Sequence, residues 1–191
     1  MFLAVIVLIF SLQSLTKADD ISEFEIEGIS IGNSLLSLAN EEKIKTTISK
    51  TQYPNDKFII YELEKLVDLK NYDYATVTTK KNDNNYIITN ITGSIYYKKL
   101  DECLKLKAEI QTEIEKLFKS VDKQETNFAS NRDKTGNSKV YGIQNYLKPY
   151  PSDEAIIVNC YHFTSESGIS RSLKVSASSH EYMYFIINEA Y

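Results

Sequence analysis

The sequence predicts an α+β fold in which helices pack on an antiparallel sheet. Short segments rich in alternating or β-branched apolar residues are separated by turn-forming Asn, Asp, Gly and Pro, and one long segment repeats apolar residues every three or four positions. The order of one helix and then three strands occurs twice, at 33–97 and 100–177. With 191 residues, 42% hydrophobic side chains and only 6 Gly and 3 Pro, the chain can build a core, which excludes disordered and collagen-like classes.

The first eighteen residues have the pattern of a secretory signal peptide. Phe2–Phe10 are all apolar, and no charged side chain occurs before Lys17. This run is shorter than the roughly 20 residues that a membrane-spanning helix needs, and Ala18 suits a cleavage site. We therefore expect export to the periplasm or the extracellular space, with no stable membrane insertion after cleavage. An uncleaved anchor is the alternative.

In the first half of the chain, 24–31 alternates apolar and polar side chains and predicts a half-buried strand. The turn at 32–34 leads into a pair of short helices, the second of which is capped by Asn40 and covers 41–48. The turn at 82–85 lacks the Gly and the distal Glu of a calcium loop, so it predicts a hairpin. Three strands complete this half, at 58–63, 74–80 and 86–97.

The second half begins with the longest helix, over 100–121, whose apolar residues form one face. The polar segment 123–139 predicts a long exposed loop. Three strands follow, and then a last helix over 181–190; the strands are expected at 140–147, 155–163 and 172–177. The repeated order predicts two tandem helix-plus-three-strand units, 19–98 and 99–191, which either stand apart or form one domain.

Cys103 and Cys160 are the only cysteines, and both follow the predicted leader. In an oxidising compartment two thiols within reach usually pair, so we predict a disulfide that joins the long helix to a strand. A catalytic thiol at Cys160 beside His162 is one alternative, and a zinc site that also includes His180 is another. No CxxC or HxxxH spacing supports the zinc site, and we expect no metal and no cofactor.

The function that we expect is a non-enzymatic binding or protein-interaction module. The chain contains 14 Tyr and no Trp, and Tyr is enriched at interfaces because it combines a large rigid ring with a polar tip. The high β-propensity of Tyr also accounts for its place in strands. If one face is used, the sheet surface with Tyr74, Thr76, Thr78 and Tyr86 is our candidate.

Two other function classes remain open, and one is excluded. A hydrolase would need paired carboxylates, for which Asp153 with Glu154, or Glu166 near His162, are the candidates. A secreted-enzyme inhibitor is the second. Nucleic acid is not expected as a partner, because the net charge of −4 gives no overall positive field toward phosphate backbones.

Residues Glu27–Leu36 (EGISIGNSLL), which lead into a charged helix, resemble the opening of the SmpA/OmlA (BamE-like) module. This resemblance implies a strand, a turn and a helix pair that packs on a three- or four-stranded antiparallel sheet. The β-lactamase inhibitor protein resembles the same module in tandem, which is the basis of the inhibitor alternative. The whole chain is also similar to small secreted bacterial proteins of unknown function that share this opening and an Asp-Glu-Cys helix.

Overall fold

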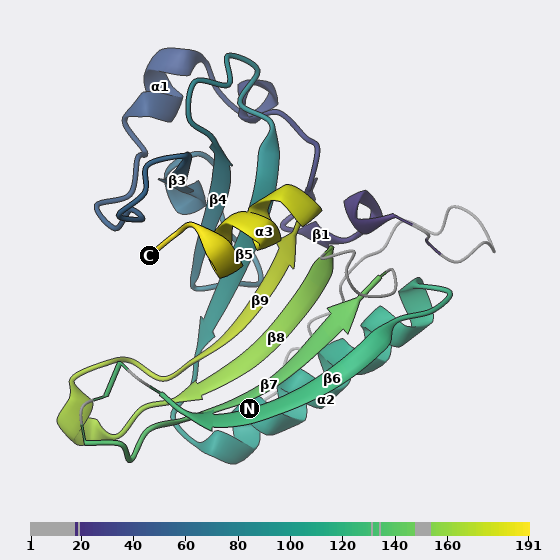
Figure 1. The fold of residues 1–191 in the computed structure, drawn as a ribbon, viewed down its shortest axis with the longest axis vertical. Coiled ribbons are helices and arrows are strands. Elements are labelled where there is room, and N and C mark those ends of the chain that lie inside the picture. The colour runs from purple at the N-terminus through teal and green to yellow at the C-terminus, as the bar shows by residue number, and fades with distance from the viewer. Residues whose placement is uncertain (1–17, 19, 131, 134, 148–153) are drawn as a thin grey trace.

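The computed structural model describes residue 18 and residues 20–130, 132–133, 135–147 and 154–191. Its main feature is one antiparallel sheet of seven strands in the order β3-β4-β5-β9-β8-β7-β6 (Figure 1). The strands are β3 (Phe58–Glu62), β4 (Tyr74–Lys80), β5 (Ile88–Tyr96), β6 (Asp122–Ala129), β7 (Lys139–Tyr146), β8 (Ala155–His162) and β9 (Ser172–Ser178). A separate small sheet contains β1 (Glu25–Ile26) and β2 (Ile29–Ser30). The α-helices are α1 (Glu41–Lys45), α2 (Leu100–Leu117) and α3 (His180–Asn188).

The predicted fold class, helices on a sheet in two tandem helix-plus-three-strand units, is therefore wrong in its balance of elements. The described residues contain three α-helices, one of them only five residues long, beside nine strands. The strands on both sides of position 98 lie in one sheet, because β5 pairs with β9 over seven residue pairs from Asn90↔Ser178 to Tyr96↔Ser172. Long-range pairing of this kind has no local sequence signal, so the repeat in element order did not reveal it.

The predicted helix pair is largely absent. Residues 35–37 form a single 3₁₀ turn capped by Ser34, and α1 covers only the first part of the expected 41–48. The chain leaves the helix because Thr46 and Thr47 bond back to the carbonyls of Lys43 and Ile44, after which Ile48 pairs with a residue of β3. Tertiary pairing with the sheet thus replaces the second half of the expected helix.

The predicted loop at 123–139 is also wrong, because its first half is strand β6. This strand pairs with β7 from Asp122↔Tyr146 to Ala129↔Lys139 and lies at the edge of the sheet. All of its residues except Thr126 are exposed, so neither face needs apolar side chains and the alternation that marks a buried strand is missing.

The expected strand at 24–31 is instead a tight hairpin. Glu27 (φ 55°) and Gly28 (φ 76°) both have positive φ, the combination that a two-residue type I′ turn requires between β1 and β2. The Glu27 carboxylate accepts hydrogen bonds from three consecutive backbone N–H groups, those of residues 70–72, at 2.6–3.2 Å. These bonds attach the hairpin to the segment that precedes β4.

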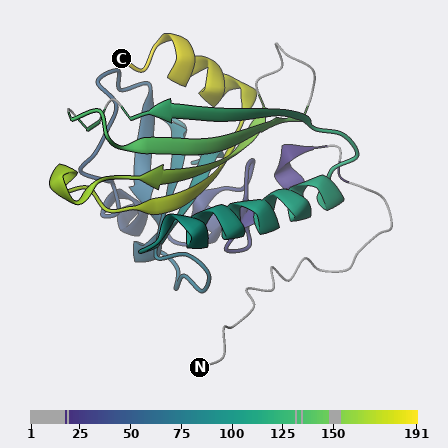
Figure 2. The same ribbon diagram turned by 90° about the horizontal axis from the view of Figure 1, so that it is seen from below.

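Helices α2 and α3 lie on opposite faces of the large sheet (Figures 1 and 2). Helix α2 buries Cys103, Ile110 and Ile114 in the main core, which also contains Ile156 and Val158 of β8. The helix ends four residues before the expected position, because Ala18 pairs with Phe118 and accepts a hydrogen bond from the N–H of residue 119 at 3.3 Å.

Helix α3 builds a second, smaller core on the other face. Phe58 of β3 packs against Phe185, with ring centroids 4.7 Å apart, and against Tyr182 at 5.6 Å. The hydroxyl groups of Tyr53 and Tyr182 are 2.5 Å apart, and burial raises the pKa of both residues. Helix α3 therefore covers one end of this face.

Apart from Ala18, the predicted signal peptide lies outside the described residues, and Ala18 itself is buried at 2% exposure. No helix among the described residues is long and apolar enough to cross a membrane.

Candidate functional site

The face of the sheet that carries α3 is largely open. In Figure 1, α3 crosses in front of the strands at one end, α2 lies behind them, and no described helix covers β7, β8 and β9 below α3. Because side chains alternate between faces along a strand, strand register defines which residues share this face. We call the uncovered part the open sheet face.

Two adjacent rows of registered residues form the centre of the open sheet face. One row runs across six strands through Thr76, Thr92, Ser176, Ile157, Gln144 and Gln124. The next runs through Tyr74, Ser94, Lys174, Asn159, Gly142 and Thr126. Hydroxyl and amide side chains dominate, and neither row contains an Asp or a Glu across these six strands, although the chain has 26 of these. On the edge strand β3 the first row ends at Glu62, which is registered with Thr76 and pairs with Lys65.

Hydrogen bonds across strands hold side chains in place both in the first row and in the pair Asn90↔Ser178 beside it. The hydroxyls of Thr92 and Ser176 are 2.8 Å apart, and Asn90 Nδ2 donates to Ser178 Oγ at 2.8 Å. The Oγ1 of Thr126 and the Oδ1 of Asn159 are buried and accept no hydrogen bond from the described residues. Both atoms lie over Gly142, where there is no side chain to meet them.

Lys174 supplies a positive charge within the second row. Its Nζ lies 5.5 Å from the centroid of the Tyr161 ring, a cation–π contact. Among the described residues no carboxylate lies within ion-pair distance of it. Burial lowers the pKa of Lys174, and the positive charge of Arg132 lowers it further.

The structure separates the four residues of the predicted binding face. Tyr74, Thr76 and Thr78 share one face of β4, but Thr78 is only 1% exposed. Tyr86 is buried in the main core, where its ring centroid lies 6.2 Å from that of Tyr61. Tyr61 is registered with Val77, so Tyr86 packs against the opposite side of the sheet from the other three.

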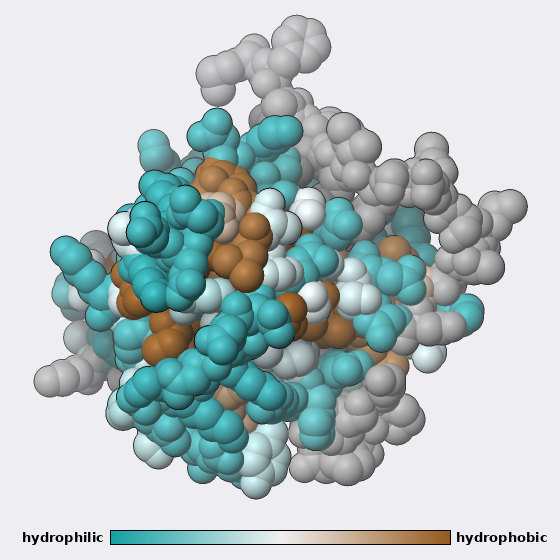
Figure 3. Space-filling model, turned by 90° about the horizontal axis from the view of Figure 1, so that it is seen from above, coloured by the Kyte–Doolittle hydropathy of each residue, from teal (hydrophilic) through white to brown (hydrophobic). Residues whose placement is uncertain are grey.

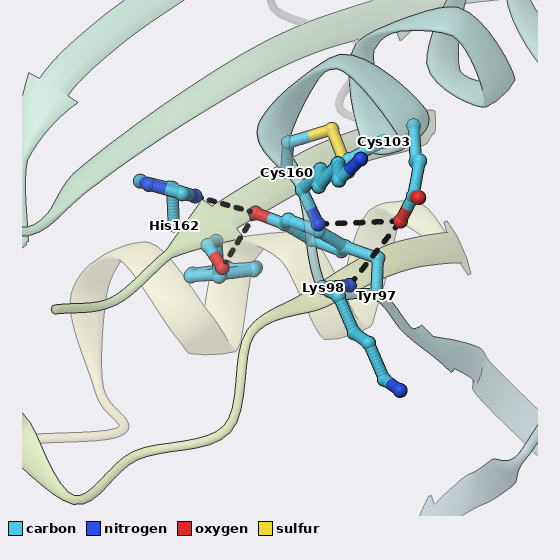
Figure 4. Close-up of a disulfide and its surroundings, with 8 residues drawn as sticks. Tyr97, Lys98, Cys103, Cys160 and His162 are labelled. Carbon is cyan, nitrogen blue, oxygen red and sulfur yellow. Dashed lines mark hydrogen bonds between the residues drawn. A yellow bond between two sulfur atoms is a disulfide. The ribbon is translucent and has the colours of Figure 1, made fainter. Parts of the chain in front are cut away.

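The predicted disulfide between Cys103 and Cys160 is confirmed (Figure 4). It joins α2 to β8, and both residues are buried, at 1% and 0% exposure. A structural disulfide is consistent with an oxidising, exported compartment. Because the two sulfur atoms are bonded to each other, Cys160 cannot act as a nucleophile in this form and neither cysteine can bind zinc.

His162 lies close to the disulfide (Figure 4). Its ring stacks on that of Tyr97, with centroids 6.2 Å apart, and its Nδ1 is 3.5 Å from the Tyr97 hydroxyl. The same hydroxyl donates to the carbonyl of Tyr161 at 3.0 Å. Burial lowers the pKa of His162 and the charge of Arg171 adds to this, while burial raises the pKa of Tyr97 to about 12. These groups form a half-buried polar cluster that packs the start of α2 against β8.

The hydrolase candidates are not brought together within the described part of the chain. Asp153 lies outside the described residues, and Glu154 immediately precedes β8. Glu166 is exposed in the 3₁₀ turn Ser165–Ser167 and makes no described ion pair with His162. In the ranges that the structure describes, no group of three or more His, Cys, Asp or Glu side chains is arranged to hold a metal ion.

Exposed apolar side chains do not concentrate in one patch. Figure 3 shows hydrophobic residues as separate areas among hydrophilic ones on the face that it draws. The large exposed ones come from different elements, and they are Leu36, Ile48, Tyr96, Phe128, Tyr184, Ile187 and Tyr191. Tyr96 (53% exposed) and Phe128 (50%) belong to β5 and β6, on two sides of the open sheet face.

Sequence reasoning named Tyr74 and Thr76, which begin the two rows on β4, but missed the residues that β8 and β9 supply, although one signal was present. In 172–178 (SLKVSAS) the apolar side chains alternate with Ser and Lys, which places Lys174 with Ser172 and Ser176 on the polar side. The neighbours that β5 and β8 supply could not be foreseen, because they depend on pairing between strands that are distant in sequence.

Comparison with known proteins adds no assignment: no protein-family model matches the chain, and neither a curated protein nor a solved structure matches it.

Proposed function

We propose that this chain is an exported, non-catalytic binding module whose ligand lies across the open sheet face. The observation that carries the proposal is the absence of Asp and Glu from the two central rows between β4 and β6, in a chain with 26 acidic residues; the first row meets an acid only at Glu62 on the edge strand β3. Ordinary solvated surfaces are rich in charged side chains, whereas the centres of interfaces are depleted of them. Charge depletion on a wide, uncovered face therefore favours a binding surface.

The types of side chain support the same role. Ser, Thr, Asn and Gln supply adaptable hydrogen bonds, and Tyr supplies rigid contact area at low entropic cost. Ile157, half-buried in the middle of the first row, adds an apolar contact. The disulfide supports an oxidising, exported location for this binding.

A photocrosslinking experiment tests the proposal. A benzoylphenylalanine introduced at Gln124, an exposed member of the first row, is expected to capture a discrete ligand from the exported fraction of the cells that make the chain. The matched control carries the same group at Thr112, which is exposed on α2 and points away from the open sheet face. We expect the Gln124 adduct to disappear in a Ser176→Arg background and to persist in a Thr112→Arg background.

Two outcomes would contradict the proposal. Equal adducts from both positions would mean that the open sheet face has no special affinity. A Gln124 adduct that survives Ser176→Arg would mean that the ligand contacts the edge strand alone.

A further inference from the structure

Two cations lie on adjoining aromatic rings, Lys174 in the second row of the open sheet face and Arg132 in the loop between β6 and β7, and the charge of Arg132 acts on Lys174. Lys174 Nζ lies 5.5 Å from the centroid of the Tyr161 ring, and the Arg132 guanidinium carbon lies 5.7 Å from that of Phe163. The two rings are themselves parallel neighbours, with centroids 6.1 Å apart and planes at 12°. The fold thus places a lysine and an arginine on adjoining aromatic rings.

Neither cation has a counterion within the described part of the chain. No Asp or Glu oxygen there lies within 4.0 Å of the Lys174 ammonium or the Arg132 guanidinium. Eight of the described lysines do pair with a carboxylate, and several other described bases, most of them exposed, have no such pair; Lys174 differs from most of these because it is half-buried. A half-buried ammonium that is left unpaired costs free energy, and a second positive charge nearby increases that cost.

We propose that Lys174 and Arg132 bind a doubly charged oxyanion, a phosphate or sulfate group of the ligand that occupies the open sheet face. A dianion matches the two positive charges, and Arg and Lys are the side chains that recognise such groups. Neutral donors lie beside them, because Asn159 is registered with Lys174 and its Nδ2 is 3.3 Å from the Tyr161 hydroxyl. The binding energy would come from pairing charges that the fold leaves uncompensated.

This inference rests on the proposed function and narrows its ligand class. It is tested with the purified, disulfide-bonded chain and inorganic phosphate or sulfate as the probe, at constant ionic strength maintained with chloride. In a ¹H–¹⁵N correlation spectrum we expect saturable shifts at the amides of Asn159, Tyr161 and Lys174. Acetate, a monoanion, is expected to bind more weakly than either dianion.

Two variants keep the test decisive. Arg132→Gln alters an exposed side chain, and Lys174→Gln removes the half-buried charge; each is expected to weaken phosphate binding about tenfold or more, since each removes one charge-assisted contact. The matched control is Lys105→Gln, which removes the same charge from the exposed surface of α2. Retained spectral dispersion shows that a variant is folded.

Unchanged affinity in both Gln variants, or shifts that rise without saturation, would overturn the oxyanion site. That result would leave the crosslinking experiment at Gln124 unaffected, so the binding role and the anion site can fail separately. Loss of the Gln124 adduct with phosphate binding intact would show the reverse, an anion site without the wider binding face.

Discussion

The side-chain amides of Gln111 and Asn145 hydrogen-bond to each other in both directions. Gln111 Nε2 donates to Asn145 Oδ1 at 2.8 Å, and Asn145 Nδ2 donates to Gln111 Oε1 at 3.0 Å. Gln111 is on α2 and Asn145 is on β7, and both are buried, at 6% and 0% exposure. A buried amide that loses its hydrogen-bond partner costs free energy, and a shift of α2 along the sheet would separate the two amides. The pair therefore favours one position of α2 relative to β7.

The amide pair predicts strong coupling between the two residues. Gln111→Leu or Asn145→Leu alone leaves the side-chain oxygen of the other amide without its donor, although Gln111 Nε2 still donates to Glu115 and Asn145 Nδ2 still donates to the carbonyl of Ile156. We expect each to lower the unfolding free energy by about 1–3 kcal/mol. The double variant should lose less than the sum of the two, which urea unfolding in a double-mutant cycle measures. Gln124→Leu, an exposed amide on β6, is the control and should change little. Simple additivity would show that the pair does not act as a unit.

The disulfide predicts a large loss of stability when it is removed. Cys103 and Cys160 are separated by 57 positions, and closing a loop of this size stabilises a fold by about 4 kcal/mol in the chain-entropy model. We expect Cys103→Ala with Cys160→Ala to lose a similar amount in urea unfolding. Thiol alkylation followed by intact-mass analysis, with and without reductant, is the companion measurement. An unchanged unfolding midpoint would contradict the role of the bond in stability.

Asp133 predicts a dependence of stability on acid pH. Its carboxylate accepts hydrogen bonds from the hydroxyl of Ser138 (2.5 Å), from the backbone and hydroxyl of Thr135 (2.9 and 2.8 Å) and from the hydroxyl of Thr164 (3.3 Å). These bonds, that of Ser138 above all, lower the pKa of Asp133 to about 2. Since the pKa is about 3.9 in an unfolded chain, the stabilisation is complete above that value and is lost as the pH falls through about 2.

The measurement is a comparison of native protein with Asp133→Asn across pH. We expect the difference in unfolding free energy to be constant from pH 5 to 7 and to narrow below a pH of about 4. A difference that does not change between about pH 4 and 2 would mean that the carboxylate charge contributes nothing.

Gly93 predicts a steric limit in the centre of the sheet. A Cβ atom at this position would lie 2.4 Å from Cδ1 of the Tyr72 ring, well inside van der Waals contact. We expect Gly93→Ala to destabilise the protein by about 1–3 kcal/mol through overpacking. Adding Tyr72→Leu should relieve part of this cost, as thermal unfolding of the two single variants and the double variant would show. Equal melting of Gly93→Ala and native protein would contradict the close packing of this ring.

Much of the secondary structure was predictable, because it depends on short-range periodicity. Strands β4 and β8 and helix α3 lie within one or two residues of the expected positions, since each alternates or repeats its apolar residues over its own length. The expected cap at Asn40 is also present, because its Oδ1 accepts from Lys43 N at 2.9 Å. Ser179 caps α3 in the same way, its Oγ accepting from Tyr182 N at 3.4 Å.

The wrong predictions of secondary structure share one physical cause. Where a segment's structure depends on pairing with a distant strand, its own sequence has no periodic pattern of apolar residues that would reveal that structure. Strand β6 is polar on both faces, so its strand character comes entirely from its pairing with β7. The helix expected at 41–48 is cut short by the pairing of Ile48 with Tyr61. Tyr86 sits in a turn with a φ of 51°, and its direction into the core follows from that turn rather than from strand alternation.

The sequence by itself determined the long helix, six of the seven strands of the large sheet, and the two cysteines that meet. Local periodicity suffices for the helix and the strands, because a helix stripe and a strand alternation are properties of short segments. The disulfide follows from the cysteine count, because the chain has only two cysteines that could pair. Only the tertiary structure decided that both halves form one sheet and that Lys174 and Arg132 stand on neighbouring aromatic rings. These features depend on the pairing of β5 with β9 and of β8 with β9. The register of such a pairing is fixed by the burial of apolar side chains on one face of the sheet, and that burial involves segments from the whole chain.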